Sequence, residues 1–486
     1  MSGNVLKDLK PYEVFKFFEE MCQIPRGSGN EKGISDYLVN FAKARNLEVI
    51  QDEALNVIIK KPGTAGYENA APIILQGHMD MVCEKNTSTV HDFEKDPLQL
   101  RIDGDMIYAT GTTLGADNGI AVAMSLAVLD SNNLQHPPIE VLVTTEEETG
   151  MGGAVALNPE HINARTLINI DSEEEGKLLV SCSGGLRART SLNIAWENVQ
   201  GNFVPVAVRI RGLKGGHSGM EIHKQRGNSN KLLGRFLLDL MSAVSFDICD
   251  ISGGAKSNAI PREADVTLLI NAADEAIVKE KIQEWNNTFK NEFKVSDPDV
   301  NIEFELLSSV PSKKFSNDTK EKTIKLLTLI PSGVQTMSME IAGLVQSSTN
   351  LGVVAIENNQ LNFDSAVRSS VKSLKVDIVN QSRVISETLG AEFSTEADYP
   401  DWQYDANSNI RKVFEKVYKD MYGTNPEIVA IHAGVECGLF KEKFGEIDMI
   451  SFGPNLYDVH TPDEHMSISS VERSWDYLVN VLKEIK

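Results

Sequence analysis

Cysteine, basic charge and long apolar runs are all scarce in this sequence. Its five cysteines are scattered without C-x-x-C spacing, which argues against a disulfide framework. With 47 basic against 69 acidic residues and a formal net charge of -22, the chain lacks the clustered lysine and arginine that phosphate neutralisation needs. No apolar run approaches the roughly 20 residues that span a bilayer, and the first residues lack the apolar core of a signal peptide. We therefore expect a cytoplasmic location, with neither nucleic acid nor membrane as partner.

The length of 486 residues exceeds what a single core usually organises, so at least two domains are expected. Hydrophobic residues recur at helical spacing over 12–22 and 31–46, and short apolar runs at 56–59, 72–75, 139–144 and 166–170 read as buried strands. This alternation favours a layered α/β sheet with its sites at the strand ends.

The pattern changes between residues 188 and 398, where strands and helices occur in two roughly similar sets. The expected elements of this region are the strands 204–211, 264–270, 302–307, 352–356 and 360–367 and the helices 230–244, 275–293, 322–330 and 375–389. The α/β pattern resumes after Tyr399-Pro400. We predict an α/β/α catalytic domain split into 1–187 and 399–486, interrupted by an inserted α+β lid domain of two halves at 188–398.

Acids and histidines recur where the apolar strands end. They are His78 and Asp80, Asp117 between two glycines, the run Glu146-Glu147-Glu148, Asp171, and His460 in a distant polar loop. Each has an ordinary explanation when taken alone, such as a satisfied core histidine, a helix N-cap or a solvated turn. Their recurrence predicts a metal constellation, because like charges pack together cheaply only around a cation.

The donor types narrow the choice of metal and of reaction. Imidazole and carboxylate without thiolate spacing suit zinc, manganese or cobalt. Two such ions sharing one carboxylate would lie roughly 3.5 to 4 Å apart and act on both an attacking water and a carbonyl oxygen. Hydrolysis of an acyl bond is the reaction that such a pair suits.

At this point a family resemblance becomes specific, and it spans essentially the whole chain. Its motifs are His78-Met79-Asp80, Gly115-Ala116-Asp117-Asn118-Gly119, Glu147-Glu148-Thr149-Gly150, Asp171-Ser172-Glu173, Gly215-Gly216-His217-Ser218-Gly219, Asn258-Ala259-Ile260-Pro261-Arg262 and His432-Ala433-Gly434-Val435-Glu436-Cys437-Gly438. Their order resembles the aminoacylase-like and carnosinase-like zinc metallopeptidases, and their form is similar to the aminoacyl-histidine dipeptidases (peptidase D).

The resemblance implies a role for each matching residue. Asp117 would bridge two divalent ions, zinc before manganese or cobalt; His78 and Asp171 would hold one ion, and Glu148 and His460 the other. Asp80 would orient His78, Glu147 would be the general base, and His217 would stabilise the oxyanion. The extra acid at Glu146 leaves a base shifted by one position as the alternative.

Four further residues are candidates for substrate binding. Asn258 and Arg368 would hold the substrate's carbonyl or terminal carboxylate, for which the planar fork of arginine is well suited. For Arg368 an ordinary surface position stays open, and for His432 and Glu436 a local structural role does. Ser218 and Cys437 are poor nucleophile candidates, because neither has the surroundings that activation needs.

The resemblance implies a metallo-dipeptidase that cleaves Xaa-His dipeptides such as β-alanyl-histidine and that could form a homodimer. Within enzymes, the rivals are other peptidases and N-acyl amino acid deacylases of the same fold. The rival of a different class is a non-catalytic binding protein on this fold.

Overall fold

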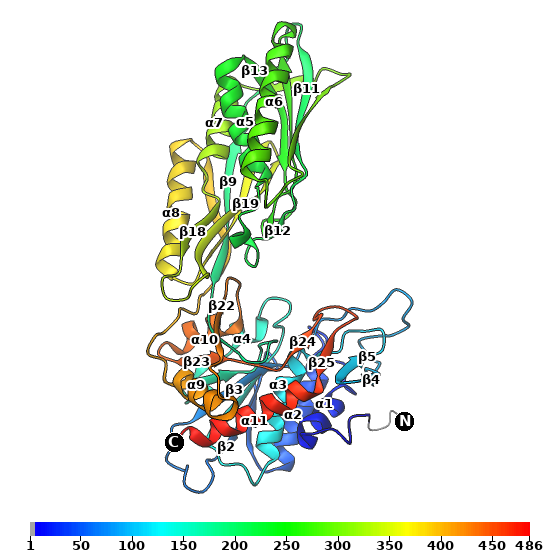
Figure 1. Cartoon of the computed structure of the whole chain (residues 1–486), viewed down its shortest axis with the longest axis vertical. Coiled ribbons are helices and arrows are strands. Elements are labelled where there is room, and N and C mark those ends of the chain that lie inside the picture. Colours follow the sequence, from blue (N-terminus) through cyan, green and yellow to red (C-terminus); the bar gives the residue numbers. More distant parts are fainter. Residues whose placement is uncertain (1–4) are drawn as a thin grey trace. The chain divides into compact units, whose positions relative to one another are not determined.

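The computed structural model describes residues 5–486, which form two compact units (Figure 1). Unit 1 contains the described residues up to Ser181, together with Tyr404–Ala430 and Val435–Lys486. Unit 2 contains Cys182–Gln403 and the short segment Ile431–Gly434. Unit 1 is therefore discontinuous in sequence, and unit 2 is inserted into it.

Unit 1 is an α/β/α unit built on an eight-stranded sheet. In spatial order its strands are β1 (Glu48–Gln51), β2 (Val57–Lys61), β6 (Ile139–Thr144), β3 (Ile73–His78), β7 (Thr166–Asn169), β23 (Asp448–Ser451), β8 (Lys177–Cys182) and β22 (Glu427–Ile431). A four-stranded sheet follows the order β24 (Leu456–Tyr457), β25 (His465–Ser467), β5 (Met106–Ala109) and β4 (Leu100–Asp103). The helices are α1 (Tyr12–Met21), α2 (Lys32–Ala44), α3 (Ala116–Asp130), α4 (Gly152–Ala156), α9 (Asn409–Tyr422), α10 (Glu436–Phe444) and α11 (Ile468–Glu484).

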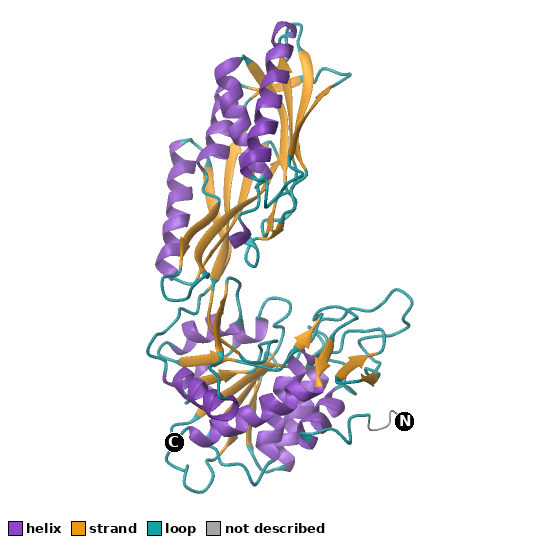
Figure 2. Ribbon diagram, in the orientation of Figure 1, coloured by secondary structure: helices purple, strands orange, loops and turns teal. Residues whose placement is uncertain are grey.

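The centre of the larger sheet is parallel, with β3 pairing β6 on one side and β7 on the other, and β23 pairing β7. Every residue of β3 and β6 is buried, as expected for parallel strands that helices cover on both faces (Figure 2). Helix α3 packs on β3 and α1, and it is apolar on nearly all sides because it lies inside these layers. Side chains at the carboxyl ends of β3, β6 and β7 therefore lie at the same edge of the sheet.

Unit 2 is built on an antiparallel sheet with helices on one face (Figure 2). The path runs β16 (Asn301–Leu306), β11 (Val204–Arg211), β15 (Ala264–Ile270), β13 (Phe246–Gly253), β19 (Val345–Glu357), β20 (Gln360–Ser369), β9 (Gly184–Asn193) and β21 (Glu392–Tyr399), with β18 (Gly333–Met337) beside β19. The helices are α5 (Ser229–Ala243), α6 (Glu275–Glu292), α7 (Asn317–Leu329) and α8 (Lys372–Thr388). Two short pairs, β10 (Trp196–Asn198) with β17 (Lys313–Phe315) and β12 (Gly216–His217) with β14 (Ala259–Ile260), complete the unit.

The unit 2 sheet consists of two halves with one topology. The elements β11, α5, β13, β15, α6 and β16 follow the sequence β-α-β-β-α-β, and so do β9, α7, β19, β20, α8 and β21. In each half the fourth strand lies beside the first, followed by the third and the second. The halves join where the second strands, β13 and β19, meet. The first half is inserted between β9 and α7 of the second.

Some strands of the structure have no clear signal in the sequence. The expected strands 139–144, 204–211 and 264–270 coincide with β6, β11 and β15. Strands β9, β13 and β21 were not expected, since β9 begins with two glycines, acidic residues interrupt β13, and β21 is an exposed polar edge strand. Pairing with neighbours that are distant in the sequence stabilises these strands. None of the helices in residues 5–486 combines the length and apolarity needed to cross a membrane.

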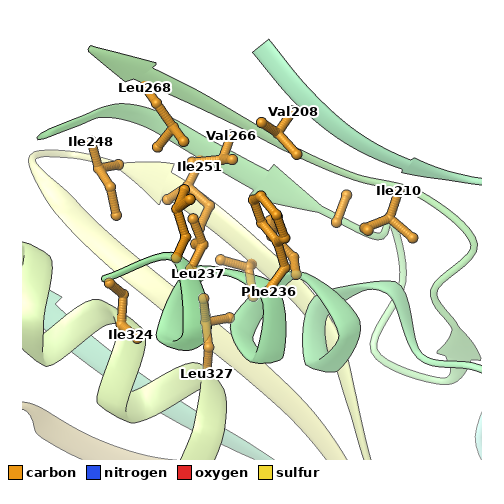
Figure 3. Close-up of a cluster of buried hydrophobic side chains, with 14 of the residues drawn as sticks. Val208, Ile210, Phe236, Leu237, Ile248, Ile251, Val266, Leu268, Ile324 and Leu327 are labelled. Carbon is orange, nitrogen blue, oxygen red and sulfur yellow. The ribbon is translucent and has the colours of Figure 1, made fainter. Parts of the chain in front are cut away.

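Prediction: the core of unit 2 depends on helix α5. Phe236 and Leu237 point from α5 toward the strand side chains Val208, Ile251 and Val266 (Figure 3), and all belong to one buried cluster. We expect Phe236→Ala to lower the free energy of unfolding of unit 2 by about 3 to 5 kcal/mol, because the cavity cannot collapse fully. Urea unfolding followed by tryptophan fluorescence measures this.

A matched control comes from the same helix. Leu238 is 41% exposed, so Leu238→Ala should change the free energy of unfolding by no more than about 0.5 kcal/mol. Equal losses for the two variants would contradict the placement of Phe236 in the core.

Candidate metal centre

The five predicted metal ligands converge at the carboxyl edge of the unit 1 sheet. His78 is the last residue of β3, while Glu148 and Asp171 follow the ends of β6 and β7. Asp117 lies in the first turn of α3, and His460 lies in the loop between β24 and β25. Because β3 lies between β6 and β7, parallel pairing brings three of these side chains to adjacent positions.

Asp117 is the centre of the cluster, since its two oxygens face different histidines. Oδ1 lies 3.2 Å from Nε2 of His78, and Oδ2 lies 3.1 Å from Nε2 of His460. Nε2 of His78 is also 3.5 Å from Oδ1 of Asp171. Nε2 of His460 is 3.1 Å from Oε2 of Glu148. The side chains thus form two groups that share one carboxylate.

The donor atoms fit divalent cations. One ligand atom each from His78, Asp117 and Glu148 lies within 4.8 Å of the others. Oε1 of Glu148 is buried and accepts no hydrogen bond from any described residue, whereas Oδ1 of Asp171 is buried 3.5 Å from Nε2 of His78. A buried carboxylate oxygen normally has a partner, so the unpartnered Oε1 of Glu148 fits coordination of a cation. Nitrogen and oxygen donors of this kind are typical of zinc, manganese and cobalt sites.

The electrostatics of the cluster show an excess of negative charge. Burial raises the pKa of Glu147 to about 8, and the charges of Asp171, Glu148 and Asp117 add to that rise. Burial likewise raises the pKa of Asp171 to about 7. Hydrogen bonds to Asp117 and Glu148 raise the pKa of His460 to about 11. Without a cation, the cluster therefore keeps protons that ordinary side chains would release at neutral pH.

The pKa of His78 is also set by burial and by the neighbouring carboxylates. Burial lowers its pKa, but the neighbouring carboxylates of Asp171, Asp117 and Asp80 outweigh burial and hold the pKa well above its ordinary value. Asp80 has no exposed surface, and its Oδ1 lies 3.3 Å from Nδ1 of His78. When a carboxylate holds Nδ1 of a histidine, Nε2 is left to bind a metal. Carboxylate support of this kind orients ligand imidazoles.

Asp80 also fixes the acidic turn after β6. Its Oδ1 accepts the backbone N–H of Glu147 at 3.1 Å, and its Oδ2 accepts that of Glu148 at 3.3 Å. The hydroxyl of Ser28 donates to Oδ2 at 2.8 Å. Asp80 therefore links the end of β3 to the turn that carries Glu148, a role beyond orienting His78.

The acidic run separates into residues with different surroundings. Glu146 is exposed and has a positive φ of 52°, while Glu147 is half-buried. The charges of His78, Asp171 and Asp117 all act on the pKa of Glu147. This geometry favours Glu147 over Glu146 as the acid that takes part in the site's proton chemistry.

Two positioning residues were missed in the sequence. Glu464 is buried, and its carboxylate accepts the backbone N–H groups of Leu114, Gly115 and Ala116 at 2.8, 3.0 and 2.8 Å. It lies four residues after His460, so it ties the His460 loop to the Asp117 loop. Arg26, also buried, donates to the carbonyl oxygens of Met79 at 3.0 Å and Gly115 at 2.5 Å. No local motif marks either residue, because their partners are distant in the sequence.

The candidate substrate-binding residues of unit 2 lie around Gly219. A methyl group added at Gly219 would lie 2.5 Å from the carbonyl oxygen of His432, 3.1 Å from Cε1 of His217 and 3.3 Å from Nε of Arg368. Asn258 is exposed beside this loop, and its carbonyl oxygen accepts the N–H of Ser218 at 2.8 Å. The structure thus brings His217, Arg368 and His432 together within unit 2.

The structure favours local roles for His432 and Glu436, the alternative that the sequence left open. His432 is buried, and its Nδ1 and Nε2 each lie 2.7 Å from a serine hydroxyl, of Ser183 and Ser348 respectively. Burial lowers the pKa of His432 to about 3, so the ring is neutral. Glu436 has no exposed surface, and its Oε2 accepts hydrogen bonds from Gln76 at 2.6 Å and Thr144 at 2.9 Å. A side chain without exposed surface cannot contact a substrate in this arrangement.

Comparisons with known proteins find similar peptidases. The model of peptidase family M20/M25/M40 matches residues 74–484. The chain is 41% identical over 482 residues to the cytosol non-specific dipeptidase of Escherichia coli (strain K12), a match that covers 99% of each protein.

Solved structures give the same result. The aminoacylhistidine dipeptidase of Vibrio alginolyticus matches with a TM-score of 0.96 at 38% identity, over 100% of this chain and 99% of that one. The aminopeptidase PepT of Bacillus cereus shares the fold, with a TM-score of 0.56 at 14% identity over 98% of this chain and 99% of that one.

Prediction: cation binding to the metal-free protein releases protons. His460, with a pKa of about 11, is protonated at pH 7, and a ligand imidazole must be neutral. We therefore expect the affinity for Zn²⁺ to rise at least about tenfold per pH unit between pH 6 and 8. Titration calorimetry in buffers of different ionisation enthalpy counts the protons released.

The variant His460→Gln provides the comparison for this titration. It should bind Zn²⁺ more weakly and release about one proton fewer. An affinity that does not change with pH, with no proton release, would show that the imidazoles are not ligands.

Proposed function

The chain belongs to peptidase family M20/M25/M40, and on this premise we propose that it is a dipeptidase that holds two divalent cations. The observation that carries the proposal is the position of Asp117, whose two oxygens face His78 and His460 separately. A single ion would not need a carboxylate directed to two imidazoles. Asp117 would bridge the ions, with His78 and Asp171 on one and Glu148 and His460 on the other. Zinc is the first choice of metal, before manganese or cobalt.

Bound cations of this kind supply Lewis acidity toward a water molecule and toward the scissile carbonyl. In the proposed reaction Glu147 accepts a proton from the attacking water and delivers it to the leaving amine, the usual work of a general base. Its half-buried position beside the ligands supports this role. His217 would donate a hydrogen bond to the developing oxyanion. Arg368 would bind the terminal carboxylate of the substrate, and Asn258 its carbonyl group.

The names of the matched relatives support dipeptides as the substrate class. One relative is named as a non-specific dipeptidase and another as an aminoacylhistidine dipeptidase. We propose that dipeptides with a free amino terminus are the substrates, with Xaa-His such as β-alanyl-histidine among them. The name of the first relative also supports a cytoplasmic location. In this proposal unit 1 is the catalytic domain and unit 2 the inserted domain, and a homodimer is an assembly to test.

Prediction: Glu147→Gln removes the general base and leaves the ligands in place. We expect kcat for a dipeptide to fall by roughly 10²- to 10⁴-fold. Metal content, measured by elemental analysis of the purified protein, should stay at the wild-type value. This pairing separates loss of proton transfer from loss of metal.

The neighbouring carboxylate supplies the control for this variant. Glu146→Gln changes an exposed side chain of the same type and should keep kcat within about threefold of wild type. If Glu146→Gln lost the activity and Glu147→Gln kept it, the base would be Glu146.

Prediction: the wild-type protein with zinc hydrolyses free dipeptides, and their N-acetylated analogues react at least about 100-fold more slowly by kcat/KM. The matched set would be Ala-His, β-alanyl-histidine, Ala-Leu, N-acetyl-Ala-Leu and a tripeptide. Removing the metal with a chelator should abolish activity, and adding zinc should restore it. Preference for the acetylated substrate would indicate a deacylase, preference for the tripeptide a tripeptidase, and no hydrolysis at all a binding protein.

A further inference from the structure

A row of three paired residues crosses one edge of the unit 2 sheet. Arg368 on β20 pairs with Gly185 on β9, and Gly185 pairs on its other side with Tyr399 on β21. Directly paired residues point to the same face of a sheet. Arg368 and Tyr399 are thus separated by one strand, roughly 10 Å between their backbones.

The middle residue of this row must be small for the outer two to meet. A side-chain carbon at Gly185 would collide with the phenol of Tyr399, lying 2.6 Å from its Cζ and closer still to the hydroxyl oxygen. The φ of Gly185 is not positive, so backbone conformation does not require glycine here. Glycine is required because the ring of Tyr399 approaches the backbone so closely.

Tyr399 crosses Gly185 and contacts the guanidinium group. Nη1 of Arg368 donates a hydrogen bond to the hydroxyl oxygen of Tyr399 at 2.7 Å. Burial raises the pKa of Tyr399, so the phenol is neutral and does not neutralise the arginine. Nε of Arg368 is buried and has no hydrogen-bond partner among residues 5–486. The tyrosine therefore holds one donor and leaves others available.

The opposite edge of the ring is also fixed by a glycine. A side-chain carbon at Gly434 would lie 2.6 Å from Cε2 and 3.1 Å from Cδ2 of Tyr399. The backbone carbonyl of Tyr399 accepts a hydrogen bond from Nζ of Lys375 at 2.9 Å. With both edges of the ring against backbone, the hydroxyl has little freedom to move away from Arg368.

The charge around Arg368 is suited to an anion. Burial lowers the pKa of His432, which lies with Arg368 around Gly219, so its ring is neutral, and each of its ring nitrogens contacts a serine hydroxyl. Arg368 is thus the permanent cation of this cluster. Its remaining N–H groups keep the planar arrangement that a carboxylate accepts.

We propose that Tyr399 is a positioning residue that orients the guanidinium of Arg368 for the terminal carboxylate of a dipeptide. The inference rests on the proposed dipeptidase function and extends it to a residue that does not itself contact the substrate. Without the tyrosine hydroxyl, the guanidinium can rotate, and each bound substrate must fix it again. The cost should therefore appear in substrate binding and not in the chemical step.

Prediction: Tyr399→Phe keeps the ring and removes the hydroxyl, and it should raise KM for a free dipeptide about 10-fold with kcat within about threefold. On the Arg368→Lys background the same change should raise KM by less than about twofold, because the group that Tyr399 positions is then absent. Steady-state kinetics of the zinc-loaded wild type, both single variants and the double variant provides this cycle.

The control removes the same atom elsewhere. The hydroxyl of Tyr37 donates to Glu20 in unit 1, so Tyr37→Phe should leave both KM and kcat unchanged. An equal rise in KM on both backgrounds, a loss confined to kcat, or no change in Tyr399→Phe would each overturn the inference. So would an Arg368→Lys variant with wild-type KM. Failure of the dipeptidase proposal would look different, because the wild type itself would then be inactive.

Discussion

The concentration of negative charge at the carboxyl edge of the unit 1 sheet is the constraint on which the rest of this protein depends. Asp80, Asp117, Glu148 and Asp171 meet at the ends of three adjacent strands, beside Glu147, where apolar layers exclude most of the water. Like charges at this depth are tolerated only if protons or cations neutralise them. The raised pKa values of Glu147, Asp171 and His460 indicate that protons take that role. Metal ions would replace those protons. The charges that destabilise the metal-free fold would then also provide the affinity for the metal.

Such a site requires its loops to be held rigidly although they are not regular structure. Two buried charged residues provide this by binding backbone groups. Glu464 accepts N–H groups from the loop that carries Asp117, while Arg26 donates to carbonyl oxygens beside His78 and Asp117. One charge therefore satisfies several backbone groups that would otherwise lack partners. The hydrogen bonds of Glu464 and Arg26 also fix the distances between the predicted ligands. They therefore stabilise the loops and set the geometry of the site at the same time.

The sequence predicted the parts of this arrangement that local signals mark. Continuous apolar runs located β3, β6 and β7, and the polar residues that end them located His78, Glu148 and Asp171. The roles of these residues stay predictions, but their convergence around Asp117 is now a matter of geometry. Glu464 and Tyr399 could not be found in this way, because what they do depends on partners brought close only by the fold. The polar strand β21 carries no hydrophobic pattern, so the sequence did not predict it. Without β21, the pairing of Tyr399 with Gly185 could not be predicted either.

The duplicated topology of unit 2 explains how one sheet presents several different groups. The first half carries His217 after β11 and Asn258 between β13 and β15, whereas the second carries Arg368 on β20 and Tyr399 on β21. The two halves thus carry different chemistry, with donors on the short strand β12 and in the loop before β14 in one half, and an oriented cation on β20 in the other. The long side chain of an arginine needs support from a neighbour to keep one orientation. The glycine at the centre of the β20, β9 and β21 row provides room for that support, which is why its lack of a side chain matters more than its flexibility.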